Sequence, residues 1–185
     1  MALHDFRRRK LTYEDYLLIP EDGQRHEILD GEHYVTAAPF LRHQRISSRL
    51  HTRLGSFIER QGLGELLAAP VDVVLSLHDI VQPDLLFISN ERARIAEEKN
   101  VQGAPDLVIE IFSKSTRIRD EGIKLERYEL LGVTEYWTVD PETRTAKVYR
   151  RRGERLETAA EISAEGALST PLLPGLEIPL SEIFQ

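Results

Sequence analysis

The sequence predicts an α/β fold in which a β-sheet is flanked by helices. Three observations support this: an Asp-Gly turn between two short strand patterns, a long amphipathic helix pattern, and several short apolar runs bounded by Pro, Gly, Asn or Asp. A chain of 185 residues that is 41% hydrophobic has the length and composition of one domain with a substantial core. We therefore expect residues 1–185 to form a single domain.

Local signals place the elements of the N-terminal half. Thr12 and Asp15 have the spacing of a capping box, which marks a helix start. Asp30-Gly31 favours the positive φ angles of a type I′ turn, and Gly62 ends a run of apolar residues at helical spacing. The expected elements are a short helix at about 13–20, a β-hairpin of 25–29 and 32–36, and a long helix at 41–61.

The C-terminal half alternates apolar runs with turn residues. Gly132 closes a second helical pattern, and a turn beginning at Asp140 separates two strand patterns. The tail from Ala164 is rich in Pro, Gly and Ser, and we expect it to wrap the surface. The expected elements are strands at 65–69, 71–75, 84–88 and 106–112, a helix at 116–131, and a hairpin of 135–139 and 146–150.

Composition and charge limit the classes of function. The chain has no cysteine, which excludes disulfides, a thiolate nucleophile and cysteine-based metal sites, and which fits a cytoplasmic location. No signal-peptide pattern follows the basic residues 7–10, and no apolar run has transmembrane length, so we expect no membrane partner. The net charge of -7 argues against a nucleic-acid partner, unless a bound cation and a local cluster of arginines offset it.

Two acidic residues interrupt apolar strand patterns. Glu110 lies inside the nearly continuous apolar run 106–112, and Asp84 opens another such run directly after Pro83. Burying either carboxylate without a partner is costly, so the pair on neighbouring strands indicates a divalent cation. Oxygen ligands favour Mg²⁺, with Mn²⁺ almost as suitable. The alternative is that Glu110 pairs with a buried lysine or arginine and that Asp84 caps a turn.

Lys124 interrupts the apolar face of the second helix. Ile123, Tyr128, Leu130 and Leu131 define the arc that should face the core, and Lys124 falls within it. A lysine beside metal-bound carboxylates can stabilise charge that develops on a phosphoryl group, or orient a water molecule. The alternative is that its stem is buried while its ammonium reaches the rim, and spacing alone does not decide between the two.

Several further residues carry weaker signals. Glu27, taken alone, has the position of an ordinary exposed strand acid, on the face opposite Ile28. His43 shares a helical stripe with Leu50 and Leu54, where a partly buried, hydrogen-bonded histidine is more common than a metal ligand. The first long helix also has a basic stripe that either tracks phosphates or is a solvated face, the second being slightly favoured. The stripe consists of Arg42, Arg45, Arg49, Arg53 and Arg60.

An ordered set of motifs resembles the Uma2 family, formerly DUF820. The resemblance covers roughly Leu11 to Phe184, which we take as the core of the domain. The combination is specific, whereas each motif alone is weak. The motifs are RHEILDGE at 25–32, Pro83-Asp84, VIEIFSKST at 108–116, Lys124 with Tyr128, and EYWTVDP at 135–141.

The resemblance implies a fold and a set of site residues. The family is placed in the restriction-endonuclease-like PD-(D/E)xK superfamily, whose core is a mixed β-sheet flanked by helices. Asp84 and Glu110 match the two motif acids, and we expect them to hold the metal ion together with the backbone carbonyl of Ile111. Glu27 matches the upstream acid that supports the site. Phe112 stands where the motif has lysine, so the resemblance implies a lysine on the following helix, Lys124, with Lys114 as the fallback.

The expected activity is hydrolysis of phosphodiester bonds in DNA by a Mg²⁺- or Mn²⁺-dependent endonuclease. The choices between DNA and RNA and between one metal and two stay open. The oligomeric state also stays open, although restriction-type folds often act as homodimers so that two sites reach two strands. Two alternatives remain: a catalytically silent module that binds nucleic acid or serves assembly, and a metal hydrolase acting on a small phosphate ester.

Overall fold

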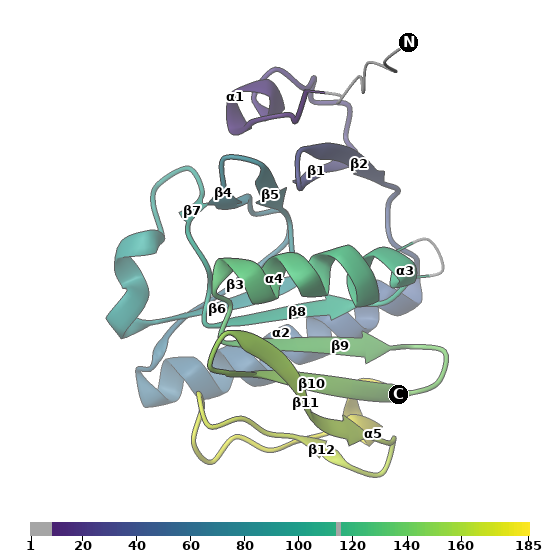
Figure 1. Ribbon diagram of the computed structural model, residues 1–185. Helices are drawn as coiled ribbons and strands as arrows, with labels where there is room; N and C mark the ends of the chain where they lie inside the picture. Colours follow the sequence, from purple (N-terminus) through teal and green to yellow (C-terminus); the bar gives the residue numbers. More distant parts are fainter. Residues whose placement is uncertain (1–8, 114–115) are drawn as a thin grey trace.

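A six-stranded mixed sheet forms the centre of the computed structural model, which describes residues 9–113 and 116–185 (Figure 1). Lys114 lies outside the described residues. The strand order is β11-β10-β9-β8-β6-β3, and β8 pairs with β9 in parallel while the other neighbours are antiparallel. The strands are β3 (Gly64–Ala68), β6 (Leu85–Ser89), β8 (Leu107–Ile111), β9 (Glu135–Asp140), β10 (Thr145–Arg152) and β11 (Arg155–Ile162).

A second sheet of five strands has the order β2-β1-β5-β4-β7. The hairpin expected at its start is confirmed, because Asp30 and Gly31 have φ angles of 50° and 81° in the turn. β1 also pairs with β5, so it is an inner strand of this sheet. The strands are β1 (Arg25–Leu29), β2 (Glu32–Thr36), β4 (Val73–Ser76), β5 (Asp79–Val81) and β7 (Val101–Gln102).

Helices cover both faces of the larger sheet. Figure 1 shows α2 behind this sheet and α4 in front of it. The capping box at Thr12 and Asp15 is present, and Gly62 closes α2 with a φ of 61°. No helix among the described residues is both long and apolar enough to cross a membrane. The helices are α1 (Tyr13–Tyr16), α2 (Leu41–Gln61), the 3₁₀ helix η1 (Asn90–Ile95), α3 (Arg117–Arg119), the π-helix η2 (Asp120–Lys124), α4 (Leu125–Leu131) and α5 (Leu180–Ile183).

The side chains of β8 point alternately into two hydrophobic cores, one on each face of the larger sheet. Leu107, Ile109 and Ile111 pack in the core that contains the apolar residues of α2. Val108 points the other way and packs in the core that contains Tyr128 of α4. Because side chains alternate along a strand, Glu110 shares the face of Val108 and is directed toward η2 and α4.

Two expectations about the C-terminal half require correction. The helix expected at 116–131 is not continuous α-helix, since the π-helix η2 lies between α3 and α4, and Leu130 is exposed and not in the core. The tail does more than wrap the surface, because Leu173, Leu180 and Ile183 are fully buried in the core beside α2. The tail also contains a small sheet of β12 (Ala167–Leu168) and β13 (Ile178–Pro179).

Candidate active site

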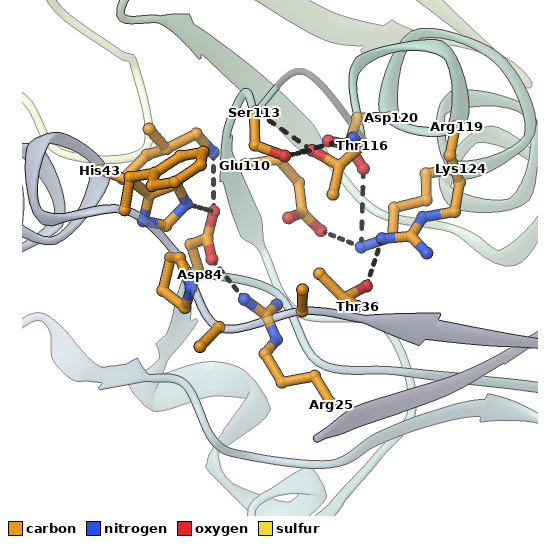
Figure 2. A pocket seen from close by; sticks show the side chains of 15 residues that line it. Arg25, Thr36, His43, Asp84, Glu110, Ser113, Thr116, Arg119, Asp120 and Lys124 are labelled. Atoms are coloured by element: carbon orange, nitrogen blue, oxygen red, sulfur yellow. Dashed lines mark hydrogen bonds and ion pairs between the residues drawn. The ribbon is translucent and has the colours of Figure 1, made fainter. Parts of the chain in front are cut away.

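A pocket of about 310 Å³ lies where the two sheets and the N-terminal end of α2 meet (Figure 2). β8 contributes Glu110, the residue before β6 contributes Asp84, and η2 contributes Lys124. Arg25 and His43 enter from β1 and α2. Segments that are distant in the sequence therefore bring both predicted metal-binding carboxylates and the predicted lysine to one pocket.

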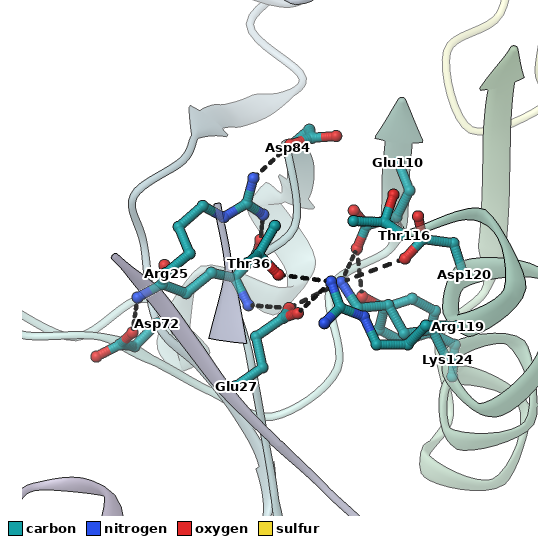
Figure 3. A network of polar contacts seen from close by, with 12 residues as sticks. Arg25, Glu27, Thr36, Asp72, Asp84, Glu110, Thr116, Arg119, Asp120 and Lys124 are labelled. Carbon is teal, nitrogen blue, oxygen red and sulfur yellow. Dashed lines mark hydrogen bonds and ion pairs between the residues drawn. The ribbon is translucent and has the colours of Figure 1, made fainter. Parts of the chain in front are cut away.

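Lys124 is buried between acidic side chains from both sheets (Figure 3). Its Nζ lies 2.7 Å from Glu110 Oε1, 2.7 Å from Glu27 Oε1 and 3.8 Å from Asp120 Oδ1. The Tyr128 hydroxyl also donates to Glu110 Oε1, at 2.9 Å. The Lys124 ammonium therefore does not reach the rim, and the alternative in which Glu110 pairs with a buried lysine is observed. This pairing is compatible with a metal at the second oxygen of Glu110.

Glu27 is fully buried behind Lys124, so its appearance as an ordinary exposed acid was misleading. The reason is that β1 is an inner strand whose face is covered by η2 and α3. The Gln82 N–H donates to Glu27 Oε1 at 2.9 Å, and the Arg119 guanidinium lies 3.4 Å from Oε2. Burial raises the pKa of Glu27, but Lys124 and Arg119 together outweigh it and hold the pKa below its ordinary value.

Asp84 accepts hydrogen bonds on both carboxylate oxygens. Oδ2 lies 3.0 Å from His43 Nε2 and accepts the Ile111 N–H at 2.8 Å, while Oδ1 accepts from Arg25 at 2.8 Å. Burial raises the pKa of Asp84, but His43, Arg25 and the Ile111 N–H outweigh it and lower the pKa to about 2. His43 is buried and bonded, as expected, although its Nδ1 has no hydrogen-bond partner among the described residues.

The pKa of Glu110 is raised, whereas the pKa of Asp84 is lowered. Burial raises its pKa to about 8, the Lys124 ammonium opposes this, and the carboxyl groups of Asp120, Asp84 and Glu27 reinforce it. Figure 3 shows the charged groups of this cluster close together. Four carboxyl groups face three permanent cations, so one negative charge lacks compensation when all four are ionised. The cluster consists of Glu27, Asp84, Glu110 and Asp120 with Arg25, Arg119 and Lys124.

The pocket fits a divalent cation in its donor chemistry. Asp84 and Glu110 both line it, and Glu110 Oε2 makes none of the contacts drawn in Figure 2. Mg²⁺ commonly takes one or two carboxylates and completes its shell with water. Within residues 9–113 and 116–185, no three His, Asp or Glu side chains are arranged to hold an ion, so water and backbone must supply the remaining ligands. Ile111 lines the pocket too, and its N–H contacts Asp84.

Three residues of the cluster were not identified from the sequence. Arg25 has the signal of i,i+2 spacing from Glu27, which places both on one face of β1. Asp120 has the signal of i,i+4 spacing from Lys124 on a helix. Arg119 precedes Asp120, and no periodicity distinguishes it from a surface arginine.

The basic stripe of α2 is not a free track for phosphates. The Arg49 guanidinium donates to the Ile183 carbonyl at 3.0 Å, and Arg53 lies 2.5 Å from Glu182, so both hold the C-terminal segment against α2. Arg42 donates to the carbonyl of Pro141. These three arginines serve tertiary packing, so they do not offset the net charge that argued against a nucleic-acid partner.

Comparisons with known proteins agree with this description. Residues 13–181 match the model of the Uma2 family, described as "Putative restriction endonuclease". A solved structure from Anabaena variabilis, described as "a putative nuclease belonging to DUF820", is 20% identical with a TM-score of 0.78, covering 94% of this chain and 97% of that chain. This similarity confirms the expected fold, a mixed sheet flanked by helices with an N-terminal hairpin.

A second solved structure, that of the type IIG restriction endonuclease BpuSI, is 12% identical with a TM-score of 0.37 and covers 80% of this chain and 16% of that chain, too distant to bear on the fold. No curated protein matches the sequence. The family model, by contrast, extends from α1 to α5 and includes every residue of the pocket. The chain therefore belongs to the Uma2 family.

Proposed function

We propose that this chain is a metal-dependent endonuclease that hydrolyses phosphodiester bonds in DNA. The observation that carries the proposal is the position of the buried Lys124 ammonium, 2.7 Å from Glu110 in a pocket that Asp84 also lines. Asp84 and Glu110 are the proposed ligands of Mg²⁺ or Mn²⁺, with the Ile111 carbonyl as a backbone ligand. Lys124 and Glu27 complete the proposed site.

Charge balance supports both the cation and the substrate class. The cluster has one uncompensated negative charge when its four carboxyl groups are ionised, because only three permanent cations face them. Adding a divalent cation leaves one positive charge, which a phosphodiester group would neutralise. A bound divalent ion supplies Lewis-acid polarisation and a water of lowered pKa. An acidic protein can thus bind a polyanion at this one position despite its net charge of -7.

The protein side chains have separate proposed roles. The Lys124 ammonium stabilises negative charge that develops on the phosphoryl oxygens in the transition state. Burial lowers the pKa of Lys124, but Glu110, Glu27 and Asp120 outweigh it, so the group remains charged. Glu27 positions Lys124 from behind, and Arg25 holds the Asp84 carboxylate in its orientation.

The similarity to other proteins supports this assignment at a coarser level. The family is described as "Putative restriction endonuclease", and the Anabaena variabilis protein as "a putative nuclease". The family model includes both sheets and the pocket between them, so we propose that they act as one nuclease domain.

Nicking of supercoiled plasmid by highly purified protein tests the proposal. We expect relaxation of the plasmid with Mg²⁺ or Mn²⁺, none with EDTA, and none from Glu110→Gln with either ion. Because a contaminating nuclease would copurify with the variant as well, cleavage that survives Glu110→Gln would show that the activity belongs to another protein. Absence of any nicking by the wild type would contradict the proposal.

One observation favours a second candidate, the catalytically silent module. Three hydrogen bonds from the protein already occupy most of the lone-pair positions of the Asp84 carboxylate, so the protein satisfies Asp84 without an ion. A silent module would keep these contacts and would not bind Mg²⁺ or Mn²⁺ at physiological concentrations. Isothermal titration of the wild type with each ion distinguishes the two candidates.

A further inference from the structure

A second pocket of about 600 Å³ adjoins the candidate active site. The two pockets share Phe40, His43 and Ser113 in their walls, so a ligand in one lies directly beside a ligand in the other. The second pocket has the size of a small-molecule site. A polymer that places a phosphate in the first pocket can therefore place a neighbouring group in the second.

Phe40 stands between the two pockets without a structural task. Its side chain is 76% exposed, and its ring makes no aromatic or cation-π contact with the described part of the chain. It occupies the N-cap position of α2, where Ser, Thr, Asp or Asn would satisfy the free N–H groups, and it makes no capping hydrogen bond. A residue that neither packs nor caps at the mouth of a site is a candidate for contact with a ligand.

The remaining walls suit an uncharged ring better than a phosphate. Two arginines and two acids line the pocket, so its charges cancel. Arg117 lies over the Phe112 ring at 5.0 Å and is paired with Asp140, which also accepts from Thr143. Arg42 is bound to the Pro141 carbonyl. Both guanidinium groups are therefore engaged with neighbouring groups of the wall, Arg117 with Asp140 and Arg42 with the Pro141 carbonyl.

We propose that this second pocket binds an unpaired nucleobase next to the scissile phosphodiester, with Phe40 as its stacking platform. The inference rests on the proposed function and specifies its substrate class as DNA with a single-stranded segment at the cleavage position. A base inside B-form duplex is stacked on both faces and cannot enter a side pocket without leaving the stack. Aromatic stacking is also tolerant of sequence, since every base has a π-face.

Binding of a short 2-aminopurine oligonucleotide, single-stranded or annealed to its complement, tests this proposal. The measurements are anisotropy and 2-aminopurine fluorescence with Ca²⁺ in place of Mg²⁺, so that a divalent ion still offsets the negative charge of the carboxylate cluster. The variants are Phe40→Ala, Phe40→Trp and, as a matched control, Leu41→Ala. Leu41 is the next residue, is also exposed, and lines neither pocket.

We expect wild type to bind the single strand more tightly than the duplex and to quench 2-aminopurine. Phe40→Ala should weaken single-strand binding about tenfold and abolish quenching, Phe40→Trp should preserve both, and Leu41→Ala should change neither. Equal affinities for Phe40→Ala and Leu41→Ala, or a preference for duplex, would overturn the inference. If the base pocket is overturned in this way but the wild type still nicks plasmid, the proposed nuclease function stands. If the binding results are as expected but no plasmid is nicked, the base pocket stands and the proposed nuclease function fails.

Discussion

Lys124 Nζ lies 2.7 Å from Glu27 Oε1, and both side chains are shielded from solvent. Lys124 belongs to η2 beside the larger sheet, and Glu27 to an inner strand of the smaller sheet, so the contact joins the two halves of the fold. Removing one partner of a buried pair leaves an uncompensated charge and costs about 3–5 kcal/mol. Experiments on Lys124 therefore need a variant in which Glu27 is neutralised as well.

The double variant Lys124→Met with Glu27→Gln should remain folded and bind Mn²⁺, yet cleave plasmid at least about a hundredfold more slowly, because it lacks the group that stabilises transition-state charge. Glu27→Gln alone keeps the ammonium and shows how much of the lost cleavage comes from neutralising Glu27. Nicking rates with Mn²⁺, together with circular dichroism, provide the measurement.

Lys114→Met is the matched lysine control and should change the nicking rate little. Lys114 is the fallback lysine in the family pattern, so the comparison decides between two assignments. Loss of cleavage with Lys114→Met, together with normal cleavage by the Lys124 double variant, would reverse the roles of the two lysines.

Asp84→Asn and Glu110→Gln should each abolish binding of divalent ions while leaving the fold intact, because each removes one of two ligand charges. Isothermal titration with Mn²⁺ measures the binding, and thermal unfolding without metal checks the fold. If both variants bind the ion as the wild type does, the metal site lies elsewhere.

Asp79→Asn should lower the free energy of unfolding by about 2 kcal/mol at neutral pH, because Arg127 donates to both Asp79 oxygens at 2.7 Å. Burial raises the pKa of Asp79, but Arg127, Ser76 and the Asp30 N–H outweigh it and hold the pKa below its ordinary value. The folded state therefore binds fewer protons than the unfolded chain as pH falls below about 4, so this stabilisation is present above that pH and is lost on acidification.

Urea unfolding of wild type and Asp79→Asn at several pH values checks this dependence. The two midpoints should converge as the pH falls through the acidic range and should stay apart at neutral pH. A difference between the midpoints that is the same at every pH would show that Asp79 acts through packing and not through its charge.

Arg49→Ser with Arg53→Ser should lower the free energy of unfolding by about 1 kcal/mol, because these residues hold Ile183 and Glu182 in partly exposed contacts. The slope of log DNA affinity against log salt should stay the same, since the guanidinium groups are engaged within the protein. Arg45→Ser is the control on the same helix. A flattened slope in the double variant would show that Arg49 and Arg53 contact DNA phosphates.

Local patterns were sufficient to predict the elements that local chemistry determines. Asp30-Gly31 specifies the first hairpin, and Gly62 specifies the end of α2, because both need positive φ angles that few other residues adopt. The interrupted apolar pattern at Glu110 correctly indicated a buried carboxyl group, whereas the pattern at Lys124 left a buried ammonium and one at the rim equally open. Such signals are visible because a charge in a covered position breaks a periodicity.

The burial of Glu27 was not predictable from alternation. Alternation shows which residues share a face of β1, but not which face another element covers, and the covering elements η2 and α3 follow β1 by about a hundred residues. The strand β11 was missed although it forms a local hairpin with β10, because most of its residues are exposed and give no apolar pattern. The buried apolar residues of the tail were missed because their packing depends on distant contacts with α2 and the larger sheet. The sequence and its family resemblance predicted the two carboxylates and the lysine that line the pocket, whereas the surrounding arginines required the tertiary structure.

The π-helix at Asp120–Lys124 makes the candidate site depend on chain length as well as on residue identity. Each helical residue advances the side-chain direction by about 100°, so a one-codon deletion at Gly122 would rotate Arg119 and Asp120 relative to Lys124 while leaving every motif residue in the sequence. Insertions and deletions in this short segment therefore separate homologues that can assemble the cluster from those that only carry its residues.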